Sequence, residues 1–148
     1  MKGQYKRFDA ELFASNDERA RAAVCNYLNS EGVYAGPADD KFGPDLAVYV
    51  GYKHKYFIEC EIKLVWKPEQ DQFPWDTIQI PERKLKYIQG TTKDVEFWIL
   101  RSDCRMAVVI PDAAVSSSPL VEVPNKFNKS GELFMQVPIE KCTIVNLY

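Results

Sequence analysis

A seven-residue stretch near the middle of the chain, Phe57-Ile58-Glu59-Cys60-Glu61-Ile62-Lys63, constrains the fold more than any other. Aliphatic and charged residues alternate in it, which is the pattern of a β-strand whose successive side chains point to opposite faces of a sheet. Glu59, Glu61 and Lys63 share one face with Phe57, and Ile58, Cys60 and Ile62 share the opposite face. If the strand is central, such a row of charges is costly to desolvate unless the charges are paired or bind a metal.

A fourth charge, Asp45, begins the strand-like segment 45–50 that precedes this stretch. Residues 51–54 read as the turn of a hairpin to 56–62, so we expect an antiparallel return that brings Asp45 close to Glu61. Converging carboxylate oxygens suit Mg²⁺. A metal-held water beside the ammonium of Lys63 can attack a phosphodiester, because the metal lowers the pKa of the water and offsets charge on the phosphate oxygens.

The remaining elements follow from periodicity and from Gly and Pro signals. Helical spacing predicts a helix over 15–31, with Ser15 and Glu18 as a capping box, an apolar face and Gly32 as its stop. The apolar face consists of Ala20, Ala23, Val24, Tyr27 and Leu28.

The second half of the chain alternates strands with short helical or loop segments. We expect a long surface loop over 66–80, a short helix over 82–89 between Pro81 and Gly90, and a serine-rich loop over 112–119. Strands are expected at 95–100, 106–110, 133–137 and 143–147, the last two as an edge addition. This order predicts a mixed α/β sandwich.

Composition sets broad limits on the protein class. The 148 residues, 46% of them hydrophobic, suit one domain with one core. A net charge of −2 neither announces nor forbids a nucleic-acid partner. The four cysteines form no CxxC pair and the chain has one His, which argues against a structural zinc site. With no signal-peptide pattern and no bilayer-spanning apolar run, we expect a soluble, cytoplasmic protein with reduced cysteines and no membrane partner.

Pro44-Asp45 followed, sixteen residues on, by Glu61-Ile62-Lys63 resembles the motif of the PD-(D/E)XK nuclease superfamily. The resemblance covers about residues 16–110 and implies a restriction-endonuclease-like core, a central mixed β-sheet flanked by helices. Residues 111–148 would be a C-terminal β extension of the same single domain. The chain looks most like the small Holliday-junction-resolvase and phage recombination nucleases, which would place a phage-encoded protein in the host cytoplasm.

The resemblance implies a Mg²⁺-dependent deoxyribonuclease, an endonuclease acting on branched or junction DNA, with Mn²⁺ as a second supporting ion. Asp45, Glu61 and the backbone carbonyl of Ile62 would hold the metal, and Lys63 would serve the attacking water. Glu18 matches an acid that such enzymes carry on the first helix. Glu59, outside the minimal motif, is a candidate auxiliary ligand because it shares the face of Glu61. A homodimer would suit symmetric cutting of two strands.

Basic and aromatic residues near the motif form a candidate DNA-binding surface. The predicted phosphate ligands are Lys67, Arg83, Lys84 and Lys86. Trp66, Trp75 and Tyr87 lie among them and could stack on unpaired bases, with burial the alternative, above all for Tyr87.

Each of these residues also has a simpler interpretation. Glu59, Glu61 and Lys63 could be a solvated strand face, Asp45 a turn residue, and Glu18 only a helix cap. The alternative function is a catalytically inactive nuclease-fold module that binds DNA or a protein partner. A fortuitous motif in a structural protein would leave Asp45 and Glu61 far apart.

Overall fold

A mixed β-sheet of six strands forms the centre of the protein, in the order β1-β2-β3-β5-β6-β9. The computed structural model describes residues 2–38, 43–125 and 128–147. The strands are β1 (Tyr34–Pro37), β2 (Leu46–Val50), β3 (Lys53–Lys63), β5 (Asp94–Arg101), β6 (Met106–Pro111) and β9 (Thr143–Asn146). β3 and β5 are parallel, and every other pair of neighbours in this sheet is antiparallel. The chain is therefore an α/β protein with a mixed multistranded sheet.

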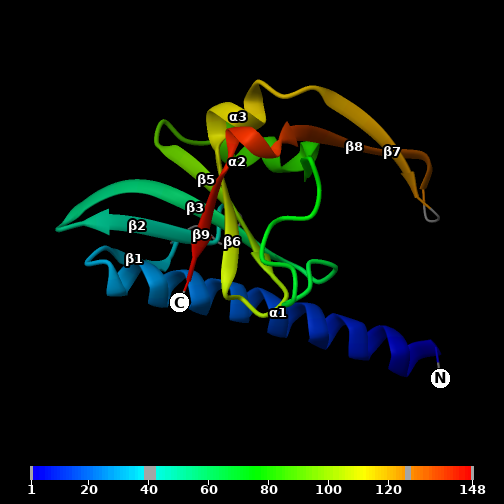
Figure 1. Ribbon diagram of the computed structural model, residues 1–148, viewed down its shortest axis with the longest axis horizontal. Coiled ribbons are helices and arrows are strands. Elements are labelled where there is room, and N and C mark those ends of the chain that lie inside the picture. Colours follow the sequence, from blue (N-terminus) through cyan, green and yellow to red (C-terminus); the bar gives the residue numbers. More distant parts are fainter. Residues whose placement is uncertain (1, 39–42, 126–127, 148) are drawn as a thin grey trace.

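The first helix, α1 (Lys2–Ser30), covers one face of this sheet (Figure 1). The predicted apolar face is confirmed, since Ala20, Ala23, Val24 and Leu28 are buried and Tyr27 packs against Trp98 at 6.1 Å between ring centroids. The helix ends at Ser30, and the expected stop, Gly32, follows in the turn with a φ of 83° that suits a residue without a Cβ. The predicted start at Ser15 is wrong, because Ser15 lies inside a helix that begins at Lys2.

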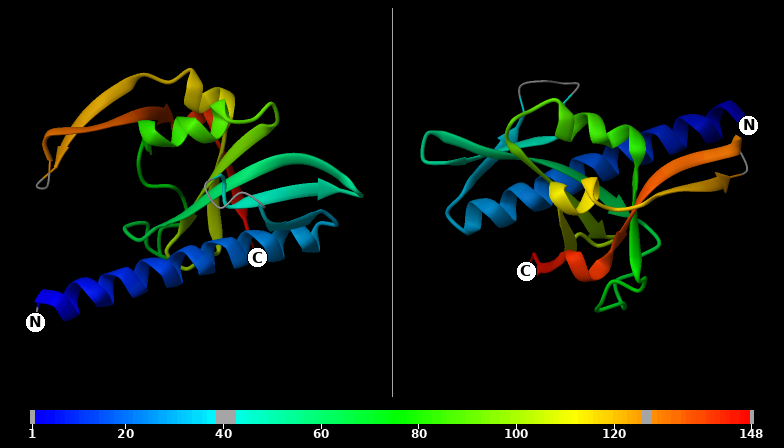
Figure 2. Two further views of the ribbon diagram at one scale, coloured as in Figure 1. Left: turned by 180° about the vertical axis from the view of Figure 1, so that it is seen from behind. Right: turned by 90° about the horizontal axis from the view of Figure 1, so that it is seen from above.

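The opposite face of the sheet is covered by two short helices and a second, smaller sheet (Figures 1 and 2). The helices are α2 (Leu85–Gln89), reached through the 3₁₀ turn η1 (Glu82–Lys84), and α3 (Asp112–Ser116). The smaller sheet has the order β4-β8-β7, formed by Thr77–Pro81, Asn128–Pro138 and Leu120–Asn125. A last 3₁₀ turn, η2 (Ile139–Lys141), leads from β8 into β9. The hairpin of β7 and β8 extends away from the central sheet (Figure 2).

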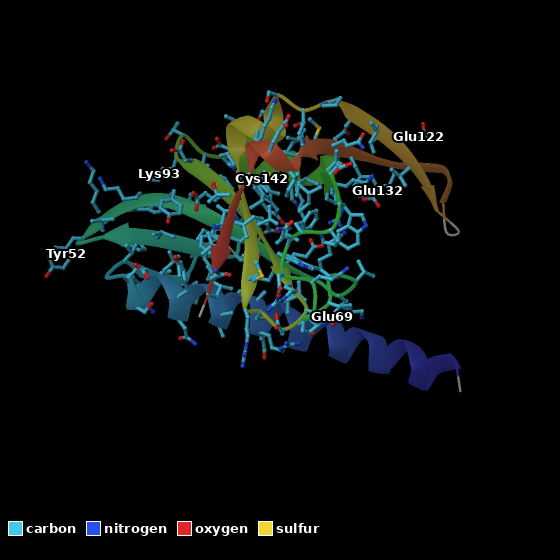
Figure 3. The ribbon with its side chains drawn as sticks, viewed as in Figure 1. Tyr52, Glu69, Lys93, Glu122, Glu132 and Cys142 are labelled. Carbon is cyan, nitrogen blue, oxygen red and sulfur yellow. The ribbon has the colours of Figure 1, made fainter. Side chains whose placement is uncertain are left out.

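Alternation along the central strands divides the core into two layers. On β5, Trp98 and Leu100 face α1, whereas Phe97 and Ile99 belong to the core under the smaller sheet. On β3, Ile58 and Cys60 face α1, so the face that carries Glu59 and Glu61 lies on the side of α2. The predicted alternation of this strand is thus confirmed. The β2–β3 hairpin is also confirmed, with Gly51 at a φ of 63° in its turn and Tyr52 at its tip (Figure 3).

Several elements differ from the sequence-based expectation. β1 and β7 were not expected, and the serine-rich segment begins as helix α3. The segment 66–80 is not a surface loop, because Trp66 and Phe73 are buried in the core and its last residues form β4. Trp66 donates its indole N–H to the Gln70 carbonyl at 3.1 Å, so its one polar group is satisfied inside the protein. Trp66 is therefore a core residue and not a base-stacking one.

The two tryptophans of this segment differ in burial, and we expect them to differ in their contribution to stability. Trp66→Ala should lower the free energy of unfolding by about 3–5 kcal/mol, because it empties a large core site. Trp75, which is 38% exposed, is the matched control, and Trp75→Ala should cost about 1 kcal/mol or less. Denaturant unfolding followed by circular dichroism measures both. Equal losses would contradict the placement of Trp66 in the core.

Candidate functional site

A cavity of 440 Å³ opens beside the charged face of β3 and brings four acidic side chains together. The acids come from three elements: Asp17 from α1, Asp45 from the start of β2, and Glu59 and Glu61 from β3. The other lining residues are Cys60, Arg83, Lys84 and Tyr87. Asp45 and Glu61 thus open into one cavity, which is opposite to what a fortuitous motif predicts.

The backbone of β3 fixes the position of Asp45. The strand register pairs Leu46 with Ile58, so Asp45 is placed beside Glu59. The expected neighbour, Glu61, lies two residues further along β3. The Cys60 amide donates to Asp45 Oδ2 at 3.0 Å, and the Asp45 amide donates to Glu59 Oε1 at 3.3 Å. The Arg21 guanidinium lies 3.6 Å from Asp45 Oδ1. Asp45 is therefore an anchored acid, with its nearest carboxyl neighbour at Glu59.

Glu59 is the most buried of the four acids, 8% exposed. Burial, a hydrogen bond between its carboxyl group and that of Asp45, and the charge of Asp45 raise the pKa of Glu59 to about 8, against the opposing effect of Lys84. Glu59 therefore keeps its proton over much of the neutral range. Two carboxyl groups that are close together and shielded from water repel each other when both are ionised. When nearby cations do not balance both charges, the pair is expected to keep one proton.

Lys84 supplies the counter-charge inside the cavity. Its ammonium donates to Glu61 Oε2 at 3.1 Å and lies 3.3 Å from Glu59 Oε2, with only 12% of its side chain exposed. Burial alone would lower the pKa of Lys84, but the charges of Glu61 and Glu59 outweigh it, so the pKa is raised and the group stays an ammonium. Because Glu59 is largely protonated near neutral pH, Glu61 carries the main opposing charge.

The helix contributes Asp17 to the cavity in place of the expected Glu18. Both residues are exposed, but Asp17 is among the residues that line the cavity and Glu18 is not. Burial and the charge of Asp45 raise the pKa of Asp17. The sequence spacing could have predicted that Asp17 faces the protein. Asp17 lies three residues before Ala20 and seven before Val24, and so shares the helix face of these buried residues.

Lys63 lies outside this cavity. It lines a separate hollow of 230 Å³ with Trp75, Thr77 and Gln79, and its ammonium is 5.0 Å from the centroid of the Trp75 ring. The contact is a cation–π interaction that directs the side chain toward β4. The three residues of the predicted catalytic motif are therefore not all brought together, and the lysine in contact with the acids is Lys84.

The other predicted phosphate ligands have different positions. Arg83 lines the acidic cavity and reaches Glu132 of β8 at 3.4 Å (Figure 3). Lys86 lies 5.1 Å over the ring of Tyr87 and lines a neighbouring cavity of 300 Å³. Lys67 is exposed in the segment after β3 and lines neither cavity. Tyr87 lines both cavities and therefore forms the wall between them.

The donor set has the chemistry that Mg²⁺ requires, since carboxylates offer hard oxygen ligands. Their present arrangement is not a ready ligand shell: within the residues that the structure describes, no three His, Cys, Asp or Glu side chains form a group that could hold a metal ion. The Lys84 ammonium contacts two of the acids instead. Metal coordination by Asp45, Glu59, Glu61 and the carbonyl of Ile62 stays a prediction.

Comparison with other proteins adds no family. Neither the known protein families nor the curated proteins give a match to this chain. Among the helices described, none has both the length and the apolar composition needed to cross a membrane. The geometry of the acidic cavity therefore carries the functional argument.

The protonation of Glu59 predicts how stability depends on pH in metal-free buffer. A carboxyl group whose pKa is raised by folding from 4.5 to about 8 contributes stability that is complete below pH 4.5 and is lost as pH rises to about 8. We expect the free energy of unfolding to fall by up to a few kcal/mol across this window, since each pKa unit corresponds to about 1.4 kcal/mol.

Glu59→Gln should flatten this dependence, because an amide keeps the shape and does not ionise. Urea unfolding at intervals from pH 4.5 to 8, in EDTA, measures both curves. Glu122→Gln on β7, an exposed site (Figure 3), is the control and should leave the slope unchanged. An equally steep fall in Glu59→Gln would show that other groups cause it.

Proposed function

We propose that this protein is a metal-dependent nuclease that hydrolyses phosphodiester bonds of DNA at the acidic cavity. The observation that carries the proposal is the convergence of Asp17, Asp45, Glu59 and Glu61 in one cavity beside a buried ammonium. Holding acids that repel one another in one cavity costs free energy. A bound divalent cation would offset this repulsion, so a metal site gives the arrangement a function.

The order of elements supports a restriction-endonuclease-like core as the finer description of the fold. A helix, a hairpin that ends in the acidic strand, a second helix and a strand parallel to the acidic one follow in this sequence as α1, β2–β3, α2 and β5. Apart from the first turns of α1, these elements lie within residues 16–110, the part of the chain that the resemblance covers, and β1 is a further strand between α1 and β2. The small sheet of β4, β7 and β8 is an addition to this core.

The reaction adds water across a P–O bond, so that a hydroxyl group joins phosphorus and a proton reaches the leaving oxygen. A bound divalent cation supplies a water of lowered pKa and offsets the charge that grows on the phosphate oxygens. In this proposal Asp45 and Glu61 would hold the cation, Glu59 and Asp17 could add further oxygen ligands, and Arg83 would contact a flanking phosphate. The resemblance assigns the ammonium near the attacking water to Lys63.

DNA is the proposed partner, with branched or junction DNA as the first substrate to test and a homodimer as the form suited to cutting two strands. Mn²⁺ should support activity as well as Mg²⁺, because it takes the same hard oxygen ligands.

One observation favours a second candidate, a module of the same fold that binds DNA or a protein partner without cutting. The ammonium of Lys84 already contacts Glu61 and Glu59, so two of the four acids have a counter-charge without a metal. Folded, Mn²⁺-supplied protein that binds but does not cleave linear, flapped or four-way DNA would support this candidate over the nuclease.

The nuclease proposal predicts that two conservative substitutions abolish cleavage. Asp45→Asn and Glu61→Gln remove one negative charge each at nearly unchanged shape, and each should lower the rate at least about 100-fold. The measurement is single-turnover cleavage of end-labelled linear, flapped and four-way DNA with Mg²⁺ or Mn²⁺. Glu122→Gln, with the same chemical change on the distant hairpin, should cut at the wild-type rate. Cleavage that survives both cavity substitutions would show that the activity lies elsewhere.

A further inference from the structure

We propose that Lys84, and not Lys63, is the functional lysine of the acidic cavity: in the metal-free protein it is the counter-ion of Glu61 and a partner of Glu59, and once a divalent cation is bound it contacts the scissile phosphate. This inference rests on the proposed function for its second half. Its first half concerns the protein without DNA and can be tested separately.

The contacts of the two lysines differ. Lys84 has its nitrogen within 3.3 Å of an oxygen of each β3 acid and is almost enclosed. Lys63 has its nitrogen over Trp75, in a hollow that none of the four acids lines. An ammonium stabilises a phosphate only at contact distance, so the lysine that already lies among the acids is the better placed of the two.

The strand register explains why Lys63 does not lie among the acids. Asp45 is placed beside Glu59 by the pairing of Leu46 with Ile58, and the amide of Cys60 donates to its carboxylate. The acids centred on Asp45 are thus Glu59 and Glu61, the two that flank Cys60. Lys63 is the next residue on that face, about 6–7 Å further along the strand, and it lies beyond the cavity.

The position of Lys84 in the fold explains why it can perform both roles. Lys84 ends the 3₁₀ turn η1, directly after β4, while its long side chain reaches back to β3. A lysine ammonium is a compact charge on a flexible stem. The head group can therefore leave the carboxylates for a nearby phosphate while the backbone of η1 stays in place.

Competition between Lys84 and a divalent cation follows from the same contacts. Both cations use the oxygens of Glu59 and Glu61, so a metal ion must displace the ammonium before it gains these ligands. Removing the ammonium should therefore destabilise the metal-free protein and strengthen metal binding at the same time. A residue that only fills space would show the first effect without the second.

The test uses Lys84→Met, which keeps the length and the apolar stem and removes the charge, with Lys63→Met as the rival and the exposed Lys141→Met as the control. Mn²⁺ affinity is measured by titration calorimetry, and melting temperature is measured in EDTA and in saturating Mn²⁺. We expect Lys84→Met to melt several degrees lower than wild type in EDTA and to bind Mn²⁺ at least about tenfold more tightly. Lys63→Met should match Lys141→Met in both measurements.

DNA cleavage at saturating Mn²⁺ tests the second half. Lys84→Met should lose much more of the single-turnover rate than Lys63→Met, although it binds the metal better. A larger loss in Lys63→Met would overturn the assignment, and so would equal Mn²⁺ affinities of wild type and Lys84→Met, or no Mn²⁺ binding at all. If wild type binds Mn²⁺ but cuts no DNA, the nuclease proposal fails, and the affinity of Lys84→Met still decides whether Lys84 is the counter-ion.

Discussion

The contact of one ammonium, that of Lys84, with the carboxyl groups of Glu59 and Glu61 holds the acidic cavity together. Like charges that share a face of a central strand must be compensated, and here the compensation is divided between a proton on Glu59 and the charge of Lys84. The rest of the site is arranged around this balance. Asp45 is fixed by the amide of Cys60, and Asp17 reaches the cavity from α1. Four acids and two basic side chains, Arg83 and Lys84, thus line one polar cavity.

Much of the central fold could be predicted because local signals and tertiary structure agree there. The alternation of β3, the turn at Gly51 and the apolar face of α1 each follow from a short stretch of sequence, and burial confirms them. β1 and β7 have no comparable pattern. The prolines and polar residues of the segment 66–80 favour a surface loop, although Trp66 and Phe73 in it are buried. Burial of these two aromatic residues depends on partners that are distant in the sequence.

The candidate site was predictable to a similar extent and for related reasons. Asp45, Glu59 and Glu61 belong to neighbouring strands of one hairpin, so alternation and the turn place them together. The resemblance to the nuclease family points to an acid on the first helix and to Glu18 as the matching position, but the acid that lines the cavity is its neighbour Asp17. A helix turns about 100° per residue, so adjacent residues face different surroundings. The position of Lys84 among the acids depends on how β4 and η1 cross the sheet, which no pattern around Lys84 reveals.

The pairing of β4 with β8 connects the site to a distant part of the sequence. Lys84 follows β4, and within the described residues β4 is an edge strand of its sheet with β8 as its neighbour, where Ile80 lies opposite Met135 and Pro81 opposite Phe134. The acids of the cavity belong to the first 61 residues, but the strand that positions their lysine is completed by residues near 135. β8 thus takes part in positioning Lys84, although none of its residues is among those that line the cavity. Charge compensation in the cavity therefore depends on the pairing of two strands that are far apart in the sequence.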